Sequence, residues 1–588
     1  MPASTAFPYL DPKPQLLTLL EQAVQKVAAG SMPLLELERP KQPSHGDFAC
    51  NVAMQLSKAL KRNPRELAQS LISALPASDL LEKAEIAGPG FINLFLKPAA
   101  WQGVAAHVLE QGAAYGSGKV GGDNAGQGEK VQVEFVSANP TGPLHVGHGR
   151  GAAFGASLCN VLKLAGYDVQ REFYVNDAGR QMDILALSTW LRYLELCGEF
   201  VPFPGNAYQG GYVGAMADSI YALHSDRYKR AAADVTNAVP AAGDDAEGHL
   251  DALIANAKRL LGADYAYIHG HVLEEQMGDC RNDLTEFGVT FDTWFSEKTL
   301  HESGLIDRAV EQLRKHGHVY EQNGALWFRS TAFGDEKDRV VRRENGIYTY
   351  FAADIAYHIN KFERGFNRVV DVWGADHHGY IPRVKGALSA AGLDPDRLTV
   401  ALVQFAVLYR NGQKASMSTR SGEYVTLRDL RAEVGNDAAR FFYVLRKSEQ
   451  HLDFDLDLAK SQSNDNPVYY IQYAHARICS VLNSWAGVER DLLDADSSLL
   501  REPQELALLK RLVEFPETIN VAARELSPHV IAYYLKDLAA DMHGLYVACQ
   551  FLVADEALKQ ARLLLIAATR QVLRTGLGLL GVSAPEKM

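Results

Sequence analysis

The chain has 588 residues, of which 47% are hydrophobic and 22% charged, as is typical of a soluble globular protein with three or four domains. No apolar stretch has membrane-spanning length, and residues 1–14 lack the basic and apolar segments of a signal peptide. The six cysteines form no Cys-x-x-Cys pair, which argues against a disulfide framework and a zinc site and favours the cytoplasm. The net charge of −12 argues against a surface that grips many phosphates.

Residues 1–112 are expected to form a first domain. Asn63-Pro64 predicts the N-cap and first residue of a helix, so two helices should meet there. This break divides a group of basic residues and favours a solvated face over a basic stripe; the group is Lys58, Lys61, Arg62 and Arg65.

Residues 113–130 are expected to be a linker, because six glycines lie between positions 116 and 130. Gly118-Lys119 does not form a phosphate loop. Ala113 stands where that motif needs a glycine, and neither Ser nor Thr follows Lys119.

The most informative run is Ser137-Ala-Asn-Pro-Thr-Gly-Pro-Leu-His-Val-Gly-His148. An alternating strand pattern at residues 131–135 precedes it, and a predicted helix at residues 149–164 follows. Two imidazoles at a helix N-terminus suit phosphate binding, and Gly147 lets a flat base lie against the main chain. The run therefore predicts an ATP site, although an isolated His-x-Gly-His could also be a structural turn.

The region from residue 131 to residue 458 is expected to be one α/β domain around a parallel sheet, with ligands at the carboxyl ends of its strands. Residues 367–375 and residues 398–409 are predicted to be further buried strands. A stretch rich in Ala, Gly and Asp at residues 205–247 predicts an insertion that spans about residues 190–345.

Residues 459–588 are predicted to form an all-helical domain, because apolar residues recur there at helical spacing. Tyr469 and Tyr473, with Arg477 close behind, could stack on unpaired bases or could be ordinary helix-packing residues. Residues 460–588 carry 13 Lys and Arg against 15 Asp and Glu, so this end is not basic.

Motifs in a fixed order over almost the whole chain resemble those of the arginyl-tRNA synthetase family, a branch of the class I aminoacyl-tRNA synthetases. The first is the run that ends in His-Val-Gly-His148. The others are Phe173-Tyr-Val-Asn-Asp177-Ala-Gly-Arg-Gln181, Tyr208-Gln-Gly-Gly-Tyr212, Tyr350-Phe-Ala-Ala-Asp354, Gly374-Ala-Asp-His-His378 and Asn466-Pro-Val-Tyr-Tyr-Ile-Gln-Tyr473.

The resemblance implies a multidomain α/β fold. Its parts would be a Rossmann-like parallel-sheet catalytic domain, an α+β N-terminal domain that touches the tRNA elbow, and an all-α anticodon-binding domain. It also implies a reaction: arginine and ATP, with Mg²⁺, form arginyl-adenylate, and the arginyl group passes to the 2′-hydroxyl of the terminal adenosine of arginine tRNA. The enzyme is expected to be a cytoplasmic monomer without protein ligands for a metal.

The resemblance also assigns residues, position by position. A guanidinium needs carboxylates placed for bidentate contact. The arginine pocket would contain Glu134, Ser137, Asn139, His148, Tyr350, Asp354 and the weaker candidate His378. ATP would be held by Pro140, Gly142, His145, Gly147, His148, Met417 and Ser418. tRNA would contact Phe91, Asn93 and Phe95, whose phenylalanines could equally be core residues, and Tyr469, Tyr473 and Arg477.

The family's Lys-Met-Ser-Lys-Ser loop corresponds to Ser416-Met-Ser-Thr-Arg420, which has neither lysine. Charge on the leaving pyrophosphate still needs a cation, in addition to the donors His145 and His148. The neighbouring basic residues are Lys414 and Arg420, which we predict take over this catalytic role, Arg420 contributing most.

Two other functions are compatible with parts of this pattern. A small-molecule nucleotidyltransferase would share the His-x-Gly-His site but would not need the helical C-terminal domain. A non-catalytic RNA-binding relative would fit Thr419 in place of lysine, but not the intact His145, His148 and Asp354.

Overall fold

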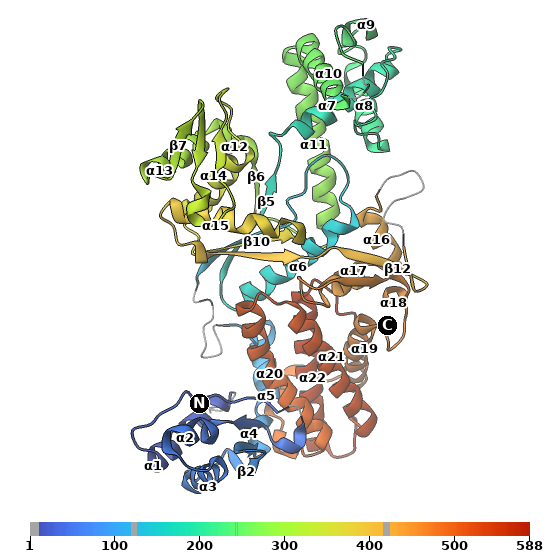
Figure 1. Cartoon of the computed structure of the whole chain (residues 1–588). Helices are drawn as coiled ribbons and strands as arrows, with labels where there is room; N and C mark the ends of the chain where they lie inside the picture. Colours follow the sequence, from blue (N-terminus) through green and yellow to red (C-terminus); the bar gives the residue numbers. More distant parts are fainter. Residues whose placement is uncertain are drawn as a thin grey trace, which may run out of the picture.

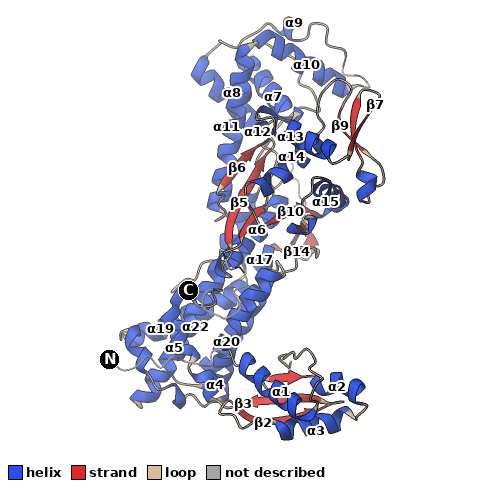
Figure 2. Cartoon of the chain, turned by 90° about the vertical axis from the view of Figure 1, so that its left-hand side faces the viewer, coloured by secondary structure: helices blue, strands red, loops and turns tan. Residues whose placement is uncertain are grey.

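The computed structural model describes residues 11–588 except residues 41, 119–125, 127, 242, 244 and 416–423. The molecule is elongated, with the N-terminal domain at one end, the helical C-terminal domain beside it, the main sheet in the middle and a helical insertion at the far end (Figures 1 and 2). Among the helices described, none is long and apolar enough to cross a membrane.

The N-terminal domain packs helices against a three-stranded antiparallel sheet of order β1-β3-β2. Its elements are α1 (Lys13–Val27), β1 (Phe48–Cys50), α2 (Val52–Leu60), α3 (Pro64–Ala74), β2 (Leu81–Ala87), β3 (Phe91–Leu96), α4 (Ala99–Gln102) and α5 (Val104–Gln111). The predicted helix start is confirmed: the Asn63 side chain accepts a hydrogen bond from the amide of Arg65 (2.9 Å), and Pro64 is the first helical residue.

The middle of the molecule contains a five-stranded parallel sheet of order β11-β10-β4-β5-β6. The strands are β4 (Lys130–Glu134), β5 (Asp168–Val175), β6 (Thr293–Ser296), β10 (Arg368–Gly374) and β11 (Leu398–Val403). β4 is central, and helix α6 (Val146–Leu164) follows it. A Cβ at Gly155 of α6 would lie 2.3 Å from the Phe135 ring, so glycine permits this close approach of helix and sheet.

The prediction of one strand over residues 398–409 is wrong. The chain leaves the sheet after Val403 and enters a second, three-stranded sheet of order β13-β12-β14. The main chain of Gln404 fixes this break. Its N–H donates to the carbonyl of Ser448 (2.9 Å), and its carbonyl accepts from the Arg150 guanidinium (2.8 Å). The elements of this region are β12 (Ala406–Arg410), β13 (Gln413–Lys414), α16 (Leu427–Val434), α17 (Asn436–Val444), β14 (Leu452–Asp455) and α18 (Leu456–Lys460).

The region predicted to be one insertion, about residues 190–345, consists of two separate excursions of the chain from the main sheet. They are separate because the chain returns to that sheet at β6. The first is helical: α7 (Arg180–Leu196), α8 (Gly211–His224), α9 (Ala232–Val235), α10 (Ala246–Leu261) and α11 (Ala263–Glu286). The second carries the antiparallel sheet β7-β8-β9: α12 (Glu297–Glu302), α13 (Leu305–Lys315), β7 (Val319–Gln322), β8 (Ala325–Phe328) and β9 (Arg339–Arg342). Helix α14 (Tyr350–Glu363) then leads to β10, and α15 (Ile381–Ala390) joins β10 to β11.

The C-terminal region is helical, as predicted, and comprises α19 (Pro467–Trp485), α20 (Pro503–Arg524), α21 (His529–Ala548) and α22 (Glu556–Leu579). It packs on the N-terminal domain, where the Tyr115 hydroxyl donates to the carbonyl of Leu512 (2.8 Å) and Lys510 pairs with Asp47. It also packs on α6, where the Asn160 amide donates to the carbonyl of Leu579 (3.0 Å). The helical domain is therefore fixed to both of its neighbours.

Candidate active site

The two motif histidines stack on each other at the start of α6, with ring centroids 3.7 Å apart. Nδ1 of His145 accepts from the amide of Gly147 (3.1 Å), and Nδ1 of His148 accepts from the amide of His145 (3.3 Å). Burial, and then the neighbouring His145, lowers the pKa of His148 to about 3, and burial also lowers the pKa of His145. Both rings are therefore neutral at pH 7, and since each Nδ1 is an acceptor, each proton is on Nε2 and can be donated to a ligand.

Gly147 lies between the rings of His145 and Phe405. Gly147 has a close neighbour on each side: a Cβ there would lie 2.8 Å from the His145 ring and 3.4 Å from the ring of Phe405. Phe405, which the sequence analysis missed, is 51% exposed although it is a large apolar residue. An exposed aromatic ring next to the glycine is suited to stacking on a nucleotide base.

The loop before the histidines is held by the first excursion. The hydroxyl of Tyr212, from α8, donates to the carbonyl of Thr141 (2.7 Å), and a Cβ at Gly142 would lie 3.2 Å from the same hydroxyl. Pro140 is buried. Thus the Tyr208–Tyr212 motif and the loop of residues 139–144 meet in space.

The turn after β4 has a strained backbone, because Val136 (φ 69°) and Ser137 (φ 40°) adopt left-handed conformations. The Ser137 hydroxyl donates to Glu134 (2.9 Å) and accepts from the amide of Tyr174 (3.1 Å). This double contact holds the turn and one oxygen of the Glu134 carboxylate.

Buried carboxylates gather where the parallel strands end. Glu134 ends β4, Asp177 follows β5 and Glu297 follows β6, while Asp354 faces them from α14. The spacing from Tyr350 to Asp354 is one helical turn, as predicted, because both belong to α14. Acidic side chains at the carboxyl ends of neighbouring strands form an anionic pocket where α/β sheets usually bind ligands.

Three of these carboxylates lack a cationic partner. Within the part of the chain that the structure describes, Asp177 accepts from Ser296 and an amide, Asp354 accepts from the Tyr380 hydroxyl, and no ion pair reaches either residue. Glu297 is 4% exposed, and its buried Oε2 has no hydrogen-bond partner there. Unpaired buried carboxylates are costly unless a bound cation compensates them.

Two of these carboxylates have raised pKa values. Burial, with Asp354 and Asp177 nearby, raises the pKa of Glu297 to about 7. Burial also raises the pKa of Asp354, and the hydrogen bond from Tyr380 offsets only part of that effect. Both carboxylates would be stabilised by a planar cation such as a guanidinium, which donates in two directions.

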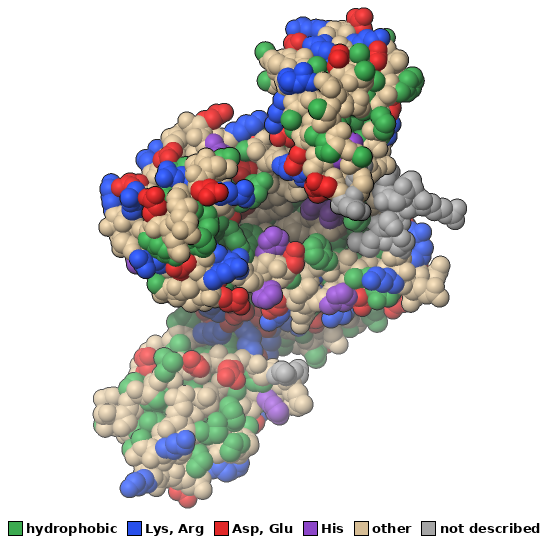
Figure 3. Space-filling view, turned by 45° about the horizontal axis from the view of Figure 1, so that its top comes forward, with side chains coloured by type: hydrophobic (Ala, Val, Ile, Leu, Met, Phe, Trp, Pro, Cys, Tyr) green, Lys and Arg blue, Asp and Glu red, His purple; other side chains and the backbone are tan. Residues whose placement is uncertain are grey.

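The other candidates for the arginine pocket lie nearer the surface. Tyr350 is 65% exposed and lines a cavity of about 380 Å³ with Asn176 and Arg180. Asn139 is exposed and its side chain accepts from that of Asn176 (3.1 Å). His378 is exposed in a turn after β10. Histidine side chains gather around the hollow between the two excursions (Figure 3).

Glu297 and Asp177 were not predicted as site residues, although Asp177 lies within the motif at residues 173–181. Glu297 follows a strand of only four residues, which the sequence analysis had included in the insertion. The available signal was an acidic residue directly after a short aromatic run, Thr293-Trp-Phe-Ser296. An acidic residue at the end of a strand in an α/β domain is worth testing as a ligand.

Backbone contacts join the loop before α6 to the start of α16. The amide of Leu427 donates to the carbonyl of Leu144 (2.8 Å), and His145 bridges Thr426 in antiparallel fashion. Lys414 lies exposed on β13, just before residues 416–423. The predicted loop residues Met417, Ser418 and Arg420 lie outside the described residues.

No cluster of three or more His, Cys, Asp or Glu side chains could hold a metal ion among the described residues. Glu134, Asp177 and Asp354 each accept a hydrogen bond from a hydroxyl group of the protein itself. The described residues therefore offer no set of protein ligands for a metal ion.

The predicted base-stacking residues form a half-exposed ladder on α19. The Tyr469 and Tyr473 rings stack with centroids 6.0 Å apart, and the Arg477 guanidinium lies 4.3 Å from the Tyr473 ring and 4.7 Å from that of Tyr546. None of the three predicted residues is buried. The ladder is thus accessible to a ligand.

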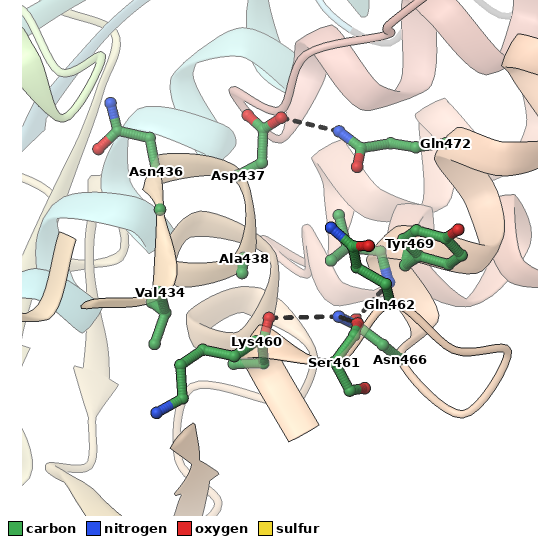
Figure 4. A pocket seen from close by; sticks show the side chains of 13 residues that line it. Val434, Asn436, Asp437, Ala438, Lys460, Ser461, Gln462, Asn466, Tyr469 and Gln472 are labelled. Carbon is green, nitrogen blue, oxygen red and sulfur yellow. Dashed lines mark hydrogen bonds between the residues drawn. The ribbon is translucent and has the colours of Figure 1, made fainter. Parts of the chain in front are cut away.

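The start of α19 also lines a polar pocket of about 390 Å³ between this helix and α17 (Figure 4). Gln472 crosses it to donate to Asp437 (2.7 Å). The pocket lies at the junction of the sheet domain and the helical domain, and Tyr469 lines it.

On the N-terminal domain, Phe91, Asn93 and Phe95 alternate along β3. Both phenylalanines are only partly buried, so they are not core residues, whereas Asn93 is 6% exposed. Lys83 lies 4.3 Å from the Phe95 ring. This face combines aromatic rings with a basic residue.

Comparisons with known proteins agree with this architecture. Three family models match: "Arginyl tRNA synthetase N terminal domain" at residues 14–96, "tRNA synthetases class I (R), catalytic domain" at residues 113–194 and 277–454, and "DALR anticodon binding domain" at residues 471–588. The gap in the catalytic match coincides with most of the first, helical excursion.

Curated relatives match over nearly the full length. An arginine–tRNA ligase of Azoarcus sp. (strain BH72) is 64% identical, covering 98% of this chain and 100% of the relative. One of Dechloromonas aromatica (strain RCB) is 62% identical with the same coverage.

Among solved structures, a putative arginyl-tRNA synthetase from Campylobacter jejuni has a TM-score of 0.72 and 30% identity, covering 84% of this chain and 100% of that one. The Thermus thermophilus enzyme has the same fold at 24% identity, with a TM-score of 0.71 and coverage of 98% and 100%. With its class I catalytic domain and the matching domains on either side, the chain belongs to the arginyl-tRNA synthetase family.

Proposed function

We propose that this enzyme is an arginine–tRNA ligase that forms arginyl-adenylate from arginine and ATP and transfers the arginyl group to the 2′-hydroxyl of the terminal adenosine of arginine tRNA. The observation that carries the proposal is the anionic pocket of Glu134, Asp177, Glu297 and Asp354. Three of its carboxylates lack a cation, and a bound guanidinium and α-ammonium would supply the missing positive charge.

Asp354 and Glu297 are our candidates for the guanidinium, with Tyr350 at the entrance. Glu134, Ser137 and Asn139 would orient the substrate near its amino group, and His378 remains a weaker candidate. Lysine would be rejected because its ammonium cannot fill two carboxylate positions as a planar fork does.

ATP would lie over the start of α6, with its base against the exposed ring of Phe405, beside Gly147, and its phosphates near His145 and His148. The carboxylate of arginine is already a nucleophile, so catalysis requires positioning and the neutralisation of charge on pyrophosphate. The two Nε2–H donors would contribute to this, MgATP would bring the metal, and Lys414 and Arg420 would supply positive charge. Pro140, Gly142, Met417 and Ser418 would complete the ATP site.

The tRNA would contact the ladder of Tyr469, Tyr473 and Arg477 through its anticodon loop. Exposed aromatic rings beside a guanidinium are suited to stacking on unpaired bases. Phe91 and Asn93 on β3 would contact the elbow. We place the domain limits at residues 1–112, 131–458 and 459–588, and expect a cytoplasmic monomer.

The decisive experiment is ATP–pyrophosphate exchange with each amino acid, with and without tRNA. Arginine alone should support exchange, and the reaction should require arginine tRNA. Exchange with another amino acid, or charging of a small molecule without tRNA, would favour a small-molecule nucleotidyltransferase. Failure of every amino acid would favour a non-catalytic RNA-binding protein.

A further inference from the structure

A buried lysine lies behind the anionic pocket. The Lys361 side chain is 0% exposed, and its Nζ donates to Glu134 (2.5 Å) and to Asp371 of β10 (2.7 Å). Burial alone would lower the pKa of this lysine, but Asp371 and Glu134 raise it above its ordinary value. Lys361 is therefore a permanent cation that joins two strands of the sheet.

A histidine completes this group. Nδ1 of His358 faces the carbonyl oxygen of Asp354 (2.7 Å), and Nε2 faces the carboxylate of Asp371 (2.8 Å). His358 therefore links the Asp371 carboxylate to the backbone of Asp354.

The contacts of Lys361 and His358 all start from α14, the helix that also carries Asp354. Asp354, His358 and Lys361 lie four and three residues apart along α14, hence on one face. This face lies against the end of β4 and the middle of β10, since Glu134 and Asp371 are paired neighbours in register. The same helix thus presents Asp354 and fixes Glu134.

We propose that Lys361 is a positioning residue for amino-acid selection, which holds the Glu134 carboxylate in place while it binds the arginine substrate. Lys361 cannot touch arginine itself, because it is fully buried behind Glu134. Asp371 and His358 fix Lys361 and the backbone of Asp354 respectively. The proposal rests on the arginine-binding function given above.

The surroundings of Glu134 explain why it needs a cation of its own. The titratable and charged groups around it are mostly acidic or neutral: Glu172 and Tyr174 on β5, Asp371 on β10, Asp354, Tyr357 and Lys361 on α14, and Arg364 just beyond that helix. Arg364 is already bound to both oxygens of Glu172 (2.6 and 2.8 Å). Without Lys361, Glu134 would be a desolvated carboxylate among like charges.

The test is Lys361→Met, which keeps the chain length and apolar bulk, compared with Lys361→Arg, which keeps the charge. Steady-state ATP–pyrophosphate exchange is measured with arginine tRNA present, varying arginine and ATP separately. In Lys361→Met the KM for arginine should rise roughly tenfold or more, because the Glu134 carboxylate loses the contact that holds it in place. The kcat and the KM for ATP should change little, and Lys361→Arg should restore most of the arginine affinity.

A second buried ion pair separates positioning from general damage. The control is Arg562→Met, which removes a buried cation from Glu505 in the helical domain (2.7 Å). It should lower thermal stability without changing the arginine KM.

An unchanged arginine KM in Lys361→Met, or an equal loss for arginine and ATP, would overturn the proposal. If Lys361→Met does not fold, Glu134→Gln replaces it, since Lys361 there keeps Asp371 as partner. That variant should show the same rise in arginine KM, and wild-type affinity in it would refute the role of the pair. A wild-type enzyme that shows no arginine-dependent exchange would instead refute the proposed function.

Discussion

The backbone amide of Val146 donates a hydrogen bond to the carbonyl of Val425, with 3.1 Å between nitrogen and oxygen. Val146 lies between the two motif histidines, and Val425 lies two residues after position 423. The rings of His145 and Tyr424 are also neighbours, with centroids 5.6 Å apart. The turn before α6 and residues 424–425 are therefore fixed to each other.

His148→Ala should slow adenylate formation roughly 100- to 1,000-fold, the usual cost of one lost donor to developing charge. The arginine KM should change little, because the loss concerns the transition state. Since the pKa of His148 is lowered to about 3, the wild-type rate should show no step from this residue between pH 5 and 8. Single-turnover measurements check both points, with the exposed His451→Ala as control; a normal rate in His148→Ala would contradict the assignment.

Asp354→Asn should reduce discrimination between arginine and the uncharged analogue citrulline by about 2–5 kcal/mol, because a buried cation would lose its charged acceptor. The measurement is the ratio of kcat/KM values for the two substrates. Tyr380→Phe is the matched control: it removes a hydrogen bond to Asp354 but leaves the charge, and should cost only about 1 kcal/mol. Retained discrimination in Asp354→Asn would remove this residue from the guanidinium site.

Arginine binding should weaken below pH 7, since the pKa of Glu297 in the empty pocket is raised to about 7. Below that pH the Glu297 carboxyl carries a proton that must leave when arginine binds. The affinity for arginine should therefore fall by up to about tenfold for each pH unit. The stability of the protein without arginine changes with pH in the opposite direction. Because folding raises the pKa of the Glu297 carboxyl, this stability falls as pH rises from the unfolded-state pKa to about 7. Arginine should therefore raise Tm more at pH 8 than at pH 6. Glu297→Gln should remove this difference, and an equal rise at both pH values in the wild type would contradict the prediction.

Local patterns in the sequence predicted the parts of the site that depend on neighbouring residues. The strand, turn and helix around His145 and the one-turn spacing of Tyr350 and Asp354 are of this kind. The contact of Lys361 with Glu134 joins residues 227 positions apart, which no periodicity reveals. Similarly, the predicted strand over residues 398–409 is apolar except for Thr399 and Gln404, and the hydrogen bonds of Gln404 with distant residues mark where it divides between two sheets.

Tyr473→Ala should raise the KM for tRNA by about 5- to 150-fold, corresponding to roughly 1–3 kcal/mol for one stacked base. The KM for arginine should not change, because Tyr473 lies in the helical domain. Aminoacylation at varied tRNA concentrations measures the effect, with the exposed Tyr533→Ala on α21 as control. A point variant is preferable to removal of the domain, which is packed on α6 and on the N-terminal domain. Equal tRNA KM values in the two variants would make the ladder a packing feature.

Residues 416–420 lack both lysines of the family's Lys-Met-Ser-Lys-Ser signature. Thr419 stands at the position of the second lysine and Ser416 at that of the first, and the run Asn139-Pro-Thr-Gly-Pro-Leu144 offers no basic residue in compensation. Pyrophosphate leaves with negative charge that needs a cation in a site closed to water. Arg420 should supply most of it and the exposed Lys414 the rest. Single-turnover adenylate formation with tRNA present should fall roughly 100- to 1,000-fold in Arg420→Ala, less in Lys414→Ala, and furthest in the double variant. The half-buried Lys385→Ala, on α15, is the control for simple loss of charge. A double variant with wild-type turnover would mean that the cation comes from elsewhere, and the role assigned to both residues would be wrong.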